Sequence, residues 1–286
     1  MSRHGLISIG TNSTRSLVAD VDSSDPRIIS ARSIGTRIGE GLKESGRLGE
    51  LPMQRTLDAI SELYADMAVQ AELVAVIATS ALRRAENADV FAARVRAVTG
   101  LLVSVVSGAE EARYSFLGAV QALPGTGWFG VADVGGGSTE YAIGVRGDVR
   151  QTVSCETGAV RLTESFPERG AERARSLLAP IAAFRKVDRL AFVGGSATTA
   201  ASILRGNRDP FTIFELTGSD LRALLATIAS MSVEARKLVP GMSPQRADIL
   251  PAGLAVLNAI LELTGHESAT VTTSDLLFGY LLDHFP

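Results

Sequence analysis

Residues 132–144 read Ala-Asp-Val-Gly-Gly-Gly-Ser-Thr-Glu-Tyr-Ala-Ile-Gly, and residues 7–19 read Ile-Ser-Ile-Gly-Thr-Asn-Ser-Thr-Arg-Ser-Leu-Val-Ala. In register, Gly10 aligns with Gly135 and Ser13 with Ser138. Each copy is predicted to be a strand, a turn of Gly, Ser and Thr, and a second strand. Glycine allows a tight turn and a close approach to a ligand, and successive turn amides with hydroxyls form an anion pocket. Two copies favour two related lobes that bind a phosphate compound between them over two ordinary hairpins.

Composition limits the class of protein. The chain has 286 residues, enough for two domains, with 46% hydrophobic and 21% charged residues, so it can form large cores and is not disordered. The net charge of −3 without a basic block argues against general nucleic-acid binding. No apolar stretch is long enough to span a membrane, so no membrane partner is expected. Cys155 is the only cysteine and the three histidines are scattered, which favours a reducing cytoplasm and argues against a histidine zinc site.

Strands and helices are predicted to alternate, which indicates an α/β architecture. Residues 36–51 are predicted to be an exposed loop, and the Pro-Gly-Thr-Gly segment at 124–127 is a candidate domain boundary. The first lobe then spans 1–123 and the second 124–274. Strands are predicted at 5–10, 14–21, 27–35, 73–78, 101–106, 128–134, 138–144, 148–155, 190–193 and 269–272, and helices at 51–70, 89–99, 110–123, 159–166, 170–184, 217–229, 233–238, 244–263 and 275–284.

Three turns carry candidate phosphate ligands. The first two are the repeated turns, and the third joins the strand at 190–193 to a helix, where a helix N-terminus can face an anion. Ordinary polar turns and a simple helix cap are the alternative for each. The candidates are Gly10, Thr11, Asn12, Ser13 and Arg15 in the first turn, Gly135, Gly136, Gly137 and Ser138 in the second, and Gly194, Gly195 and Ser196 in the third.

Acidic residues near these turns suggest a metal and a base. Asp133 and Glu140 flank the second turn, and Mg²⁺ prefers one or two carboxylates together with water and phosphate oxygens. Solvated carboxylates at strand ends are the alternative. Glu110 and Glu111 open a predicted helix, where acidic residues also suit the helix dipole. A hydrolase that attacks phosphate needs a group to orient and deprotonate water, and this pair lies just before the predicted boundary between the lobes.

Seven segments, in order, resemble the exopolyphosphatase / guanosine pentaphosphate phosphohydrolase family: residues 7–15, 78–87, 107–113, 133–140, 158–164, 194–198 and 246–253. The resemblance runs from residue 5 to about 282. It implies two actin-like (ribonuclease H-like) lobes with an interlobe cleft, and Mg²⁺-dependent hydrolysis of a terminal phosphoanhydride. It further implies that the helix over 275–286 packs on the first lobe and that a homodimer can form.

The resemblance also implies roles for single residues. Glu111 would be the catalytic base, Asp133 and Glu140 would hold or orient the metal, and Arg83 would contact phosphate. The amides of the first two turns would surround the phosphates. One position departs from the family pattern, because Ser8 stands where the first motif usually has Asp.

Three readings of the function follow. The first is release of terminal orthophosphate, with inorganic polyphosphate ranked slightly ahead of guanosine pentaphosphate as the substrate. The second is an ATP-using kinase or ATPase, since the interlobe cleft suits both. The third is a non-catalytic sensor of phosphate or an alarmone, which Ser8 favours.

Overall fold

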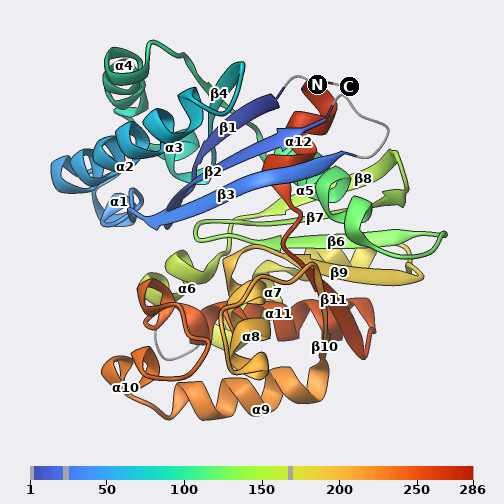
Figure 1. The fold of residues 1–286 in the computed structure, drawn as a ribbon. Coiled ribbons are helices and arrows are strands. Elements are labelled where there is room, and N and C mark those ends of the chain that lie inside the picture. Colours follow the sequence, from blue (N-terminus) through green and yellow to red (C-terminus); the bar gives the residue numbers. More distant parts are fainter. Residues whose placement is uncertain (1–2, 22–25, 167–169, 286) are drawn as a thin grey trace.

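The computed structural model describes residues 3–21, 26–166 and 170–285. It contains two β-sheets, which lie one above the other in Figure 1. The first sheet has the order β3-β2-β1-β4-β5. Helices α2 and α4 pack against it through an apolar face that repeats every three or four residues, including Leu57, Ile60 and Leu63. Its elements are β1 (Arg3–Ile9), β2 (Ser13–Asp20), β3 (Arg27–Gly35), α1 (Leu42–Ser45), α2 (Glu50–Ala68), β4 (Leu73–Ala78), α3 (Ser80–Arg84), α4 (Ala88–Thr99) and β5 (Val103–Val105).

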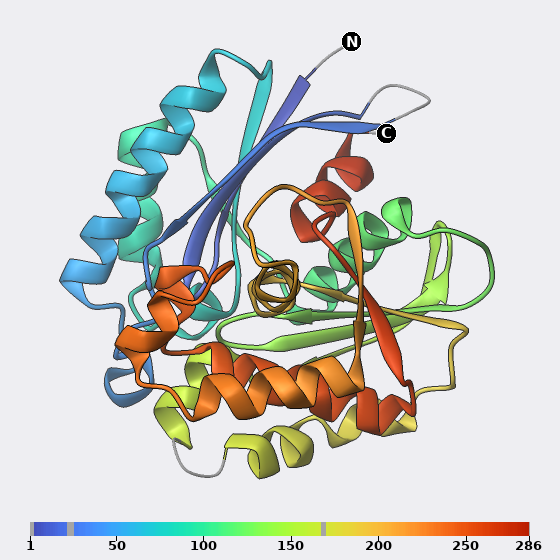
Figure 2. The same cartoon turned by 60° about the horizontal axis from the view of Figure 1, so that its bottom comes forward.

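The second sheet has the order β10-β11-β9-β6-β7-β8. Figure 2 shows α9 and α11 side by side below it, and α8 lies beside β9 and β11. Its strands are β6 (Phe129–Val134), β7 (Thr139–Val145), β8 (Asp148–Cys155), β9 (Arg189–Val193), β10 (Ile213–Thr217) and β11 (Ser268–Thr272). Its helices are α6 (Ala159–Ser165), α7 (Gly170–Leu177), a 3₁₀ turn (Ala179–Ala183), α8 (Gly195–Arg205), α9 (Gly218–Ala229), α10 (Val233–Lys237), a 3₁₀ turn (Pro244–Arg246) and α11 (Leu250–Thr264).

The two sheets repeat one topology. The order β3-β2-β1-β4-β5 in the first corresponds to β8-β7-β6-β9-β11 in the second, and β10 is added at the edge. The turns also correspond. The amide of Gly10 donates to the carbonyl of Ser13 at 3.0 Å, and the amide of Gly135 donates to the carbonyl of Ser138 at 3.1 Å. The predicted α/β fold of two related, actin-like halves is therefore confirmed.

Two helices lie between the sheets. Helix α5 (Gly108–Ala122) packs against β6, β7 and β8 on one side and against α12 (Leu276–His284) on the other. Helix α12 also contacts β1 and β2 of the first sheet (Figure 1). The backbones approach closely where Gly118 and Gly279 meet, since a Cβ at 279 would lie 1.8 Å from the carbonyl oxygen of Tyr114. Division of the chain at residue 123 stays a prediction, because α5 joins the first lobe by sequence and the second sheet by contact.

The structure corrects three element predictions. The helix predicted over 244–263 begins only at Leu250, because Pro251 has no amide to donate and fits only the first helical turn. The helix predicted over 170–184 ends at Leu177, and a 3₁₀ turn containing Pro180 follows. Strand β10 was missed, since its residues carry no clear alternation and it pairs only with β11.

The loop predicted over 36–51 is not simply exposed. It contains the short helix α1, and Ile38, Leu42 and Leu48 are buried in the core of the first half. The polar residues between these three apolar side chains hide them in a sequence pattern, and tertiary packing decides their burial.

Candidate active site

The two glycine turns meet at a small cavity between the sheets, with a volume of about 90 Å³. Gly136 lies against the first turn, since a Cβ there would be 3.2 Å from the Cβ of Thr11 and 3.3 Å from that of Asn12. A Cβ at Gly137 would lie 2.7 Å from the hydroxyl oxygens of Thr11 and Ser80. Neither glycine has a positive φ. Both are therefore needed for close packing between the halves and not for a left-handed backbone.

Backbone amides of both turns are available to an anion. The amides of Thr11 and Asn12 in the first turn, and of Gly136 and Gly137 in the second, donate to no backbone carbonyl in the part of the chain that the structure describes. All four residues line the cavity. Groups of adjacent amides of this kind bind phosphate oxygens.

Helix α8 brings a third set of amides. Gly194 precedes it with a φ of 89°, which favours glycine, and no side chain caps the helix. A Cβ at Gly194 would lie 2.7 Å from Oδ1 of Asp133, so the helix begins beside that carboxylate. The first amides of a helix lack internal partners and carry the positive end of its dipole, which favours phosphate.

Two arginines border the cavity from opposite halves. Nη2 of Arg15, on β2, lies 2.5 Å from Oδ2 of Asp275 at the start of α12. Arg246 stands close to the start of α8, since a Cβ at Gly195 would lie 1.8 Å from its Cζ. Its guanidinium forms no hydrogen bond or ion pair with any residue that the structure describes. Burial and then the charge of Arg15 lower the pKa of Arg246 to about 10, which leaves it charged at neutral pH.

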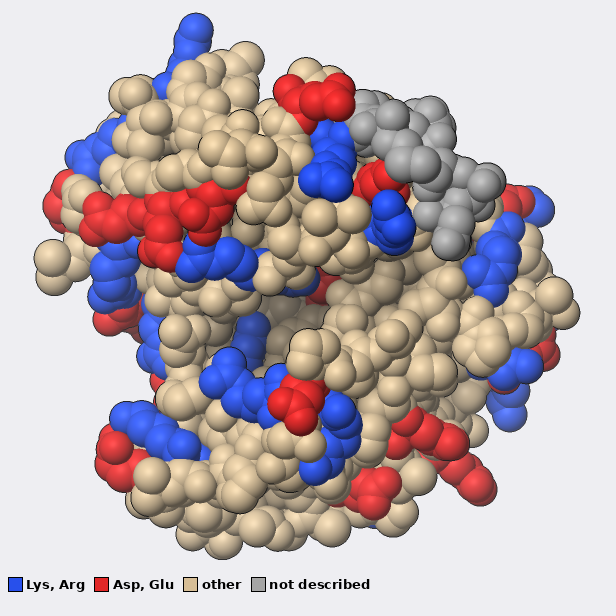
Figure 3. All heavy atoms as spheres, in the orientation of Figure 1, with Lys and Arg blue, Asp and Glu red and all other residues tan. Residues whose placement is uncertain are grey.

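A larger groove of about 430 Å³ adjoins the cavity. Arg15, Gly194, Gly195 and Arg246 border both spaces. Figure 3 shows a hollow between the two halves with Lys and Arg side chains at its rim. The arginines that line the groove are Arg15, Arg32, Arg208 and Arg246. A long anion could therefore place one end in the cavity and the rest in the groove.

Asp133 and Glu140 lie opposite each other on β6 and β7. Asp133 lines the cavity and accepts a hydrogen bond of 2.6 Å from the Ser115 hydroxyl. Burial, and then the charge of Asp275, raise the pKa of Asp133 to about 6. Glu140 is 2% exposed, is not among the residues that line the cavity, and accepts a 2.7 Å hydrogen bond from the Ser154 hydroxyl. Burial and then Glu111 raise the pKa of Glu140 well above its usual value.

Glu111 lines the cavity from the first turn of α5 and is 6% exposed. Arg83 donates to its Oε1 and to the carbonyl of Val106, the latter at 2.8 Å. Burial raises the pKa of Glu111 to about 7, against the lowering effect of Arg83. A pKa near the working pH suits a general base.

The structure brings most of the predicted site residues together. Arg83 instead pairs with Glu111, and Glu140 does not line the cavity. The Ser196 side chain faces α11, where a Cβ at Gly253 would lie 2.2 Å from its oxygen. The predicted residues that border the cavity are Gly10, Thr11, Asn12, Ser13, Arg15, Glu111, Asp133, Gly135, Gly136, Gly137, Ser138, Gly194 and Gly195.

Two residues of the site were missed from the sequence. Arg246 belongs to the segment 246–253 that carried the resemblance, which was the only signal for it. Asp275 was treated as the start of a helix only. Ser8 also lines the cavity and is buried.

The model of the Ppx/GppA phosphatase family matches residues 17–283. The chain belongs to this family. It is 32% identical to Exopolyphosphatase 2 of Mycobacterium tuberculosis, over 99% of this chain and 98% of that one. It is 28% identical to the guanosine-5'-triphosphate,3'-diphosphate pyrophosphatase of Vibrio vulnificus, over 96% of this chain and 58% of that one. The chain is thus a hydrolase of the exopolyphosphatase type, which acts on phosphoanhydride bonds.

Solved structures of Ppx/GppA proteins have the same fold. The Ppx/GppA enzyme of Aquifex aeolicus matches with a TM-score of 0.83 and 30% identity, over 99% of each chain. An exopolyphosphatase of Cytophaga hutchinsonii matches with a TM-score of 0.89 and 25% identity, over 99% of this chain and 98% of that one. The two sheets are therefore arranged as in these Ppx/GppA proteins.

Within the described residues, no helix is both long and apolar enough to cross a membrane.

The donor set fits Mg²⁺ bound together with a substrate. In the described part of the chain, no group of three or more His, Cys, Asp or Glu side chains is arranged to hold a metal by itself. Asp133 nevertheless presents a carboxylate to the cavity, and Mg²⁺ is commonly held by one or two carboxylates and substrate phosphates. Glu111, Asp133 and Glu140 are three buried carboxylates near one another. A nearby cation would reduce the repulsion between them and favour their ionised forms.

The raised pKa values of Glu111 and Asp133 predict opposite effects of pH on stability and on rate. Each group binds its proton more tightly when folded, so its contribution to stability is complete below pH 4 and is lost as the pH rises through about 6 and 7. Without divalent cations, the urea midpoint should therefore fall between pH 5 and 8. If Glu111 is the base, the rate should rise over the same range. A midpoint equally pH-dependent in Glu111→Gln would contradict the assignment to Glu111.

Proposed function

We propose that this phosphatase releases terminal orthophosphate from inorganic polyphosphate. The observation that supports this best is the convergence of two turns, the start of α8 and Arg246 on a cavity that also holds Glu111. The cavity of about 90 Å³ suits one phosphoryl group, and the arginine-lined groove suits the rest of a polyanion. The similarity to Exopolyphosphatase 2 over nearly the whole of both chains favours the same substrate.

In the proposed reaction, a water oxygen attacks the terminal phosphorus while the bond from phosphorus to the bridging oxygen breaks. Glu111 accepts the proton of the water, and the shortened chain leaves with the bridging oxygen. The turn amides and Arg246 stabilise the charge on the transferred group, so positioning and electrostatics provide most of the catalysis. Asp133, with phosphate oxygens, would hold Mg²⁺, which neutralises phosphate charge when bound.

Guanosine pentaphosphate is the second candidate substrate. Phe211 lines the groove, and the guanidinium of Arg205 lies over its ring at 5.0 Å from the centroid. An aromatic ring and an arginine form a surface on which a base can stack. The similarity to the Vibrio pyrophosphatase also favours this substrate.

A comparison of substrates tests the proposal. Phosphate release would be measured with tripolyphosphate, long-chain polyphosphate, guanosine pentaphosphate and ATP, with and without Mg²⁺. Mg²⁺-dependent release from polyphosphate supports it, and preferential release from guanosine pentaphosphate favours the second candidate. Preferential turnover of ATP would favour the ATPase reading. Binding without release from any of them would indicate a sensor.

Substitution of Arg246 by alanine is expected to weaken substrate binding. A hydrogen bond to a charged group contributes about 1.5–3 kcal/mol, so KM should rise by about 10- to 100-fold. Steady-state kinetics with tripolyphosphate would measure this. Arg175→Ala is the control, because Arg175 pairs with Glu262 on the surface and lines neither the cavity nor the groove. An unchanged KM in Arg246→Ala would contradict a role in phosphate binding.

A further inference from the structure

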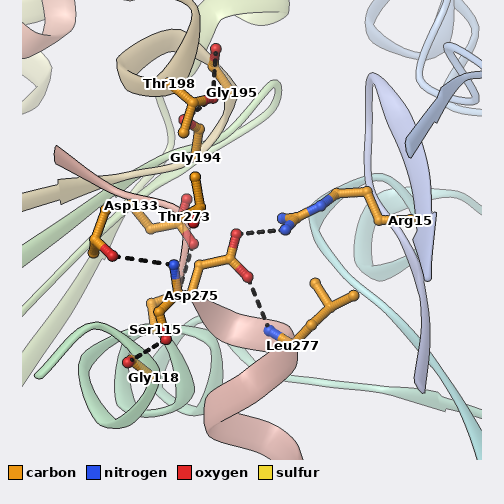
Figure 4. A network of polar contacts seen from close by, with 12 residues as sticks. Arg15, Ser115, Gly118, Asp133, Gly194, Gly195, Thr198, Thr273, Asp275 and Leu277 are labelled. Atoms are coloured by element: carbon orange, nitrogen blue, oxygen red, sulfur yellow. Dashed lines mark hydrogen bonds and ion pairs between the residues drawn. The ribbon is translucent and has the colours of Figure 1, made fainter. Parts of the chain in front are cut away.

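Asp275 connects the closing helix to the active-site cavity. Its Oδ1 accepts a hydrogen bond of 3.1 Å from the amide of Leu277 and so caps α12, while its Oδ2 lies 2.5 Å from Nη2 of Arg15. Figure 4 shows the carboxylate between these two partners. Asp275 is 4% exposed. One buried side chain therefore makes a capping interaction and an ion pair that joins positions 260 residues apart.

Arg15 has no carboxylate partner on its own sheet. The residue opposite it on β1 is Ser8, whose hydroxyl carries no charge. In the described chain, Asp275 is the carboxylate within ion-pair distance of Arg15. Aspartate at this helix cap thus supplies a charge that strand β1 does not.

Arg15 and Arg246 border the same cavity, so their like charges repel each other. Burial and then this repulsion lower the pKa of Arg246. A long arginine side chain without a fixed partner has many rotamers, and repulsion would favour those that point to solvent. One guanidinium nitrogen bound to Asp275 leaves the remaining donors of Arg15 for phosphate oxygens. The ion pair therefore holds Arg15 at the junction of the cavity and the groove, which it borders.

We propose that Asp275 is a positioning residue that holds Arg15 for binding of the substrate phosphates, in place of a carboxylate on β1. The proposal rests on the proposed function only in that the ligand is a polyphosphate. It predicts that a carboxylate at position 8, directly opposite Arg15, can replace the one at position 275.

Asp275→Asn tests this with little change in shape. Asparagine caps helices about as well as aspartate, so α12 keeps its cap while the ion pair is lost. KM for tripolyphosphate is expected to rise by about tenfold, the equivalent of one hydrogen bond to a charged group, with little change in kcat. Ser8→Asp combined with Asp275→Asn should return KM toward the original value.

Asp283→Asn is the matched control. Asp283 lies on the same helix and pairs with Arg113 at 2.5 Å, away from the cavity and the groove. Its KM should be unchanged. A similar rise in KM for Asp283→Asn would show that any lost ion pair on α12 has this effect and would overturn the proposal. So would an unchanged or lowered KM in Asp275→Asn, or no recovery in the double variant.

Binding measurements separate this proposal from the proposed function. Calorimetry would compare the Kd of tripolyphosphate for two proteins, Glu111→Gln and the double variant Glu111→Gln with Asp275→Asn. This measurement of binding does not depend on hydrolysis. If the parent protein binds tripolyphosphate but releases no phosphate, the proposed function fails while weaker binding by Asp275→Asn still supports positioning. Equal Kd values, or no binding by either protein, overturn the positioning role.

Discussion

Replacing Glu111 with glutamine is expected to lower the rate of phosphate release by about 10²- to 10⁴-fold, the usual loss when a general base is removed. Glutamine keeps the size of the side chain but cannot accept the proton of water. Glutamine is uncharged, so the cost of burying an ionised carboxylate is absent. The protein should therefore remain folded or become more stable at neutral pH. Single-turnover measurements with tripolyphosphate at pH 8 would give the rate, and urea unfolding would give the stability.

The neighbouring residue provides the control. Glu110 is exposed, and its side chain accepts a 2.7 Å hydrogen bond from the amide of Ser107 in a capping box, which glutamine also forms. Glu110→Gln should therefore act like the parent protein. A rate for Glu111→Gln within experimental error of the parent would show that another group, or substrate alone, activates the water.

The pairing of Arg83 with Glu111 affects the pKa of the proposed base. Burial alone would hold the carboxyl protonated, and Arg83 opposes this by donating to Oε1. The balance leaves the pKa of Glu111 at about 7. Arg83 was predicted to contact phosphate. Its pairing with Glu111 supports a second role, in which it keeps the proposed base ionised near neutral pH.

The repeated turns could be found from sequence because their chemistry is local. Matching of Gly10 with Gly135 needs only a short segment in each half, and the structure gives both turns the same internal hydrogen bond. The two sheets also share one strand order, as expected if the two halves are related. Local patterns therefore predicted the fold class and most residues around the cavity.

Other residues of the site depend on contacts between distant segments. Arg246 lies at the end of a 3₁₀ turn, and its packing against Gly195 brings it to the start of α8. Asp275 reaches Arg15 because the chain passes from β11 of the second sheet to α12, which packs on β1 and β2 of the first. No local pattern encodes either approach. The burial of Glu140 away from the residues that line the cavity likewise depends on packing, and its role as a metal ligand stays a prediction.

The crossing of α5 and α12 places Glu111 and Asp275 on two helices whose separation is fixed by glycine. A Cβ at Gly118 would lie 2.0 Å from the carbonyl oxygen of Asp275, and one at Gly279 would lie 1.8 Å from that of Tyr114. Both obstacles are backbone atoms, which cannot rotate away as a side chain can. The helices would have to separate to accept even one methyl group.

Gly279→Ala is therefore expected to destabilise the protein by about 3 kcal/mol, the upper end of the usual cost of overpacking, although alanine favours helices over glycine. Urea unfolding would measure this. Gly170→Ala is the control, because among the residues that the structure describes a Cβ there meets only the Leu162 side chain at 3.8 Å, an ordinary contact. Separation of α5 and α12 would also move Glu111, the proposed base, relative to Arg15, so Gly279→Ala should lose activity even where it is still folded. Stability equal to that of Gly170→Ala would mean that the crossing can relax, and that glycine is not what sets the distance between the two halves of the site.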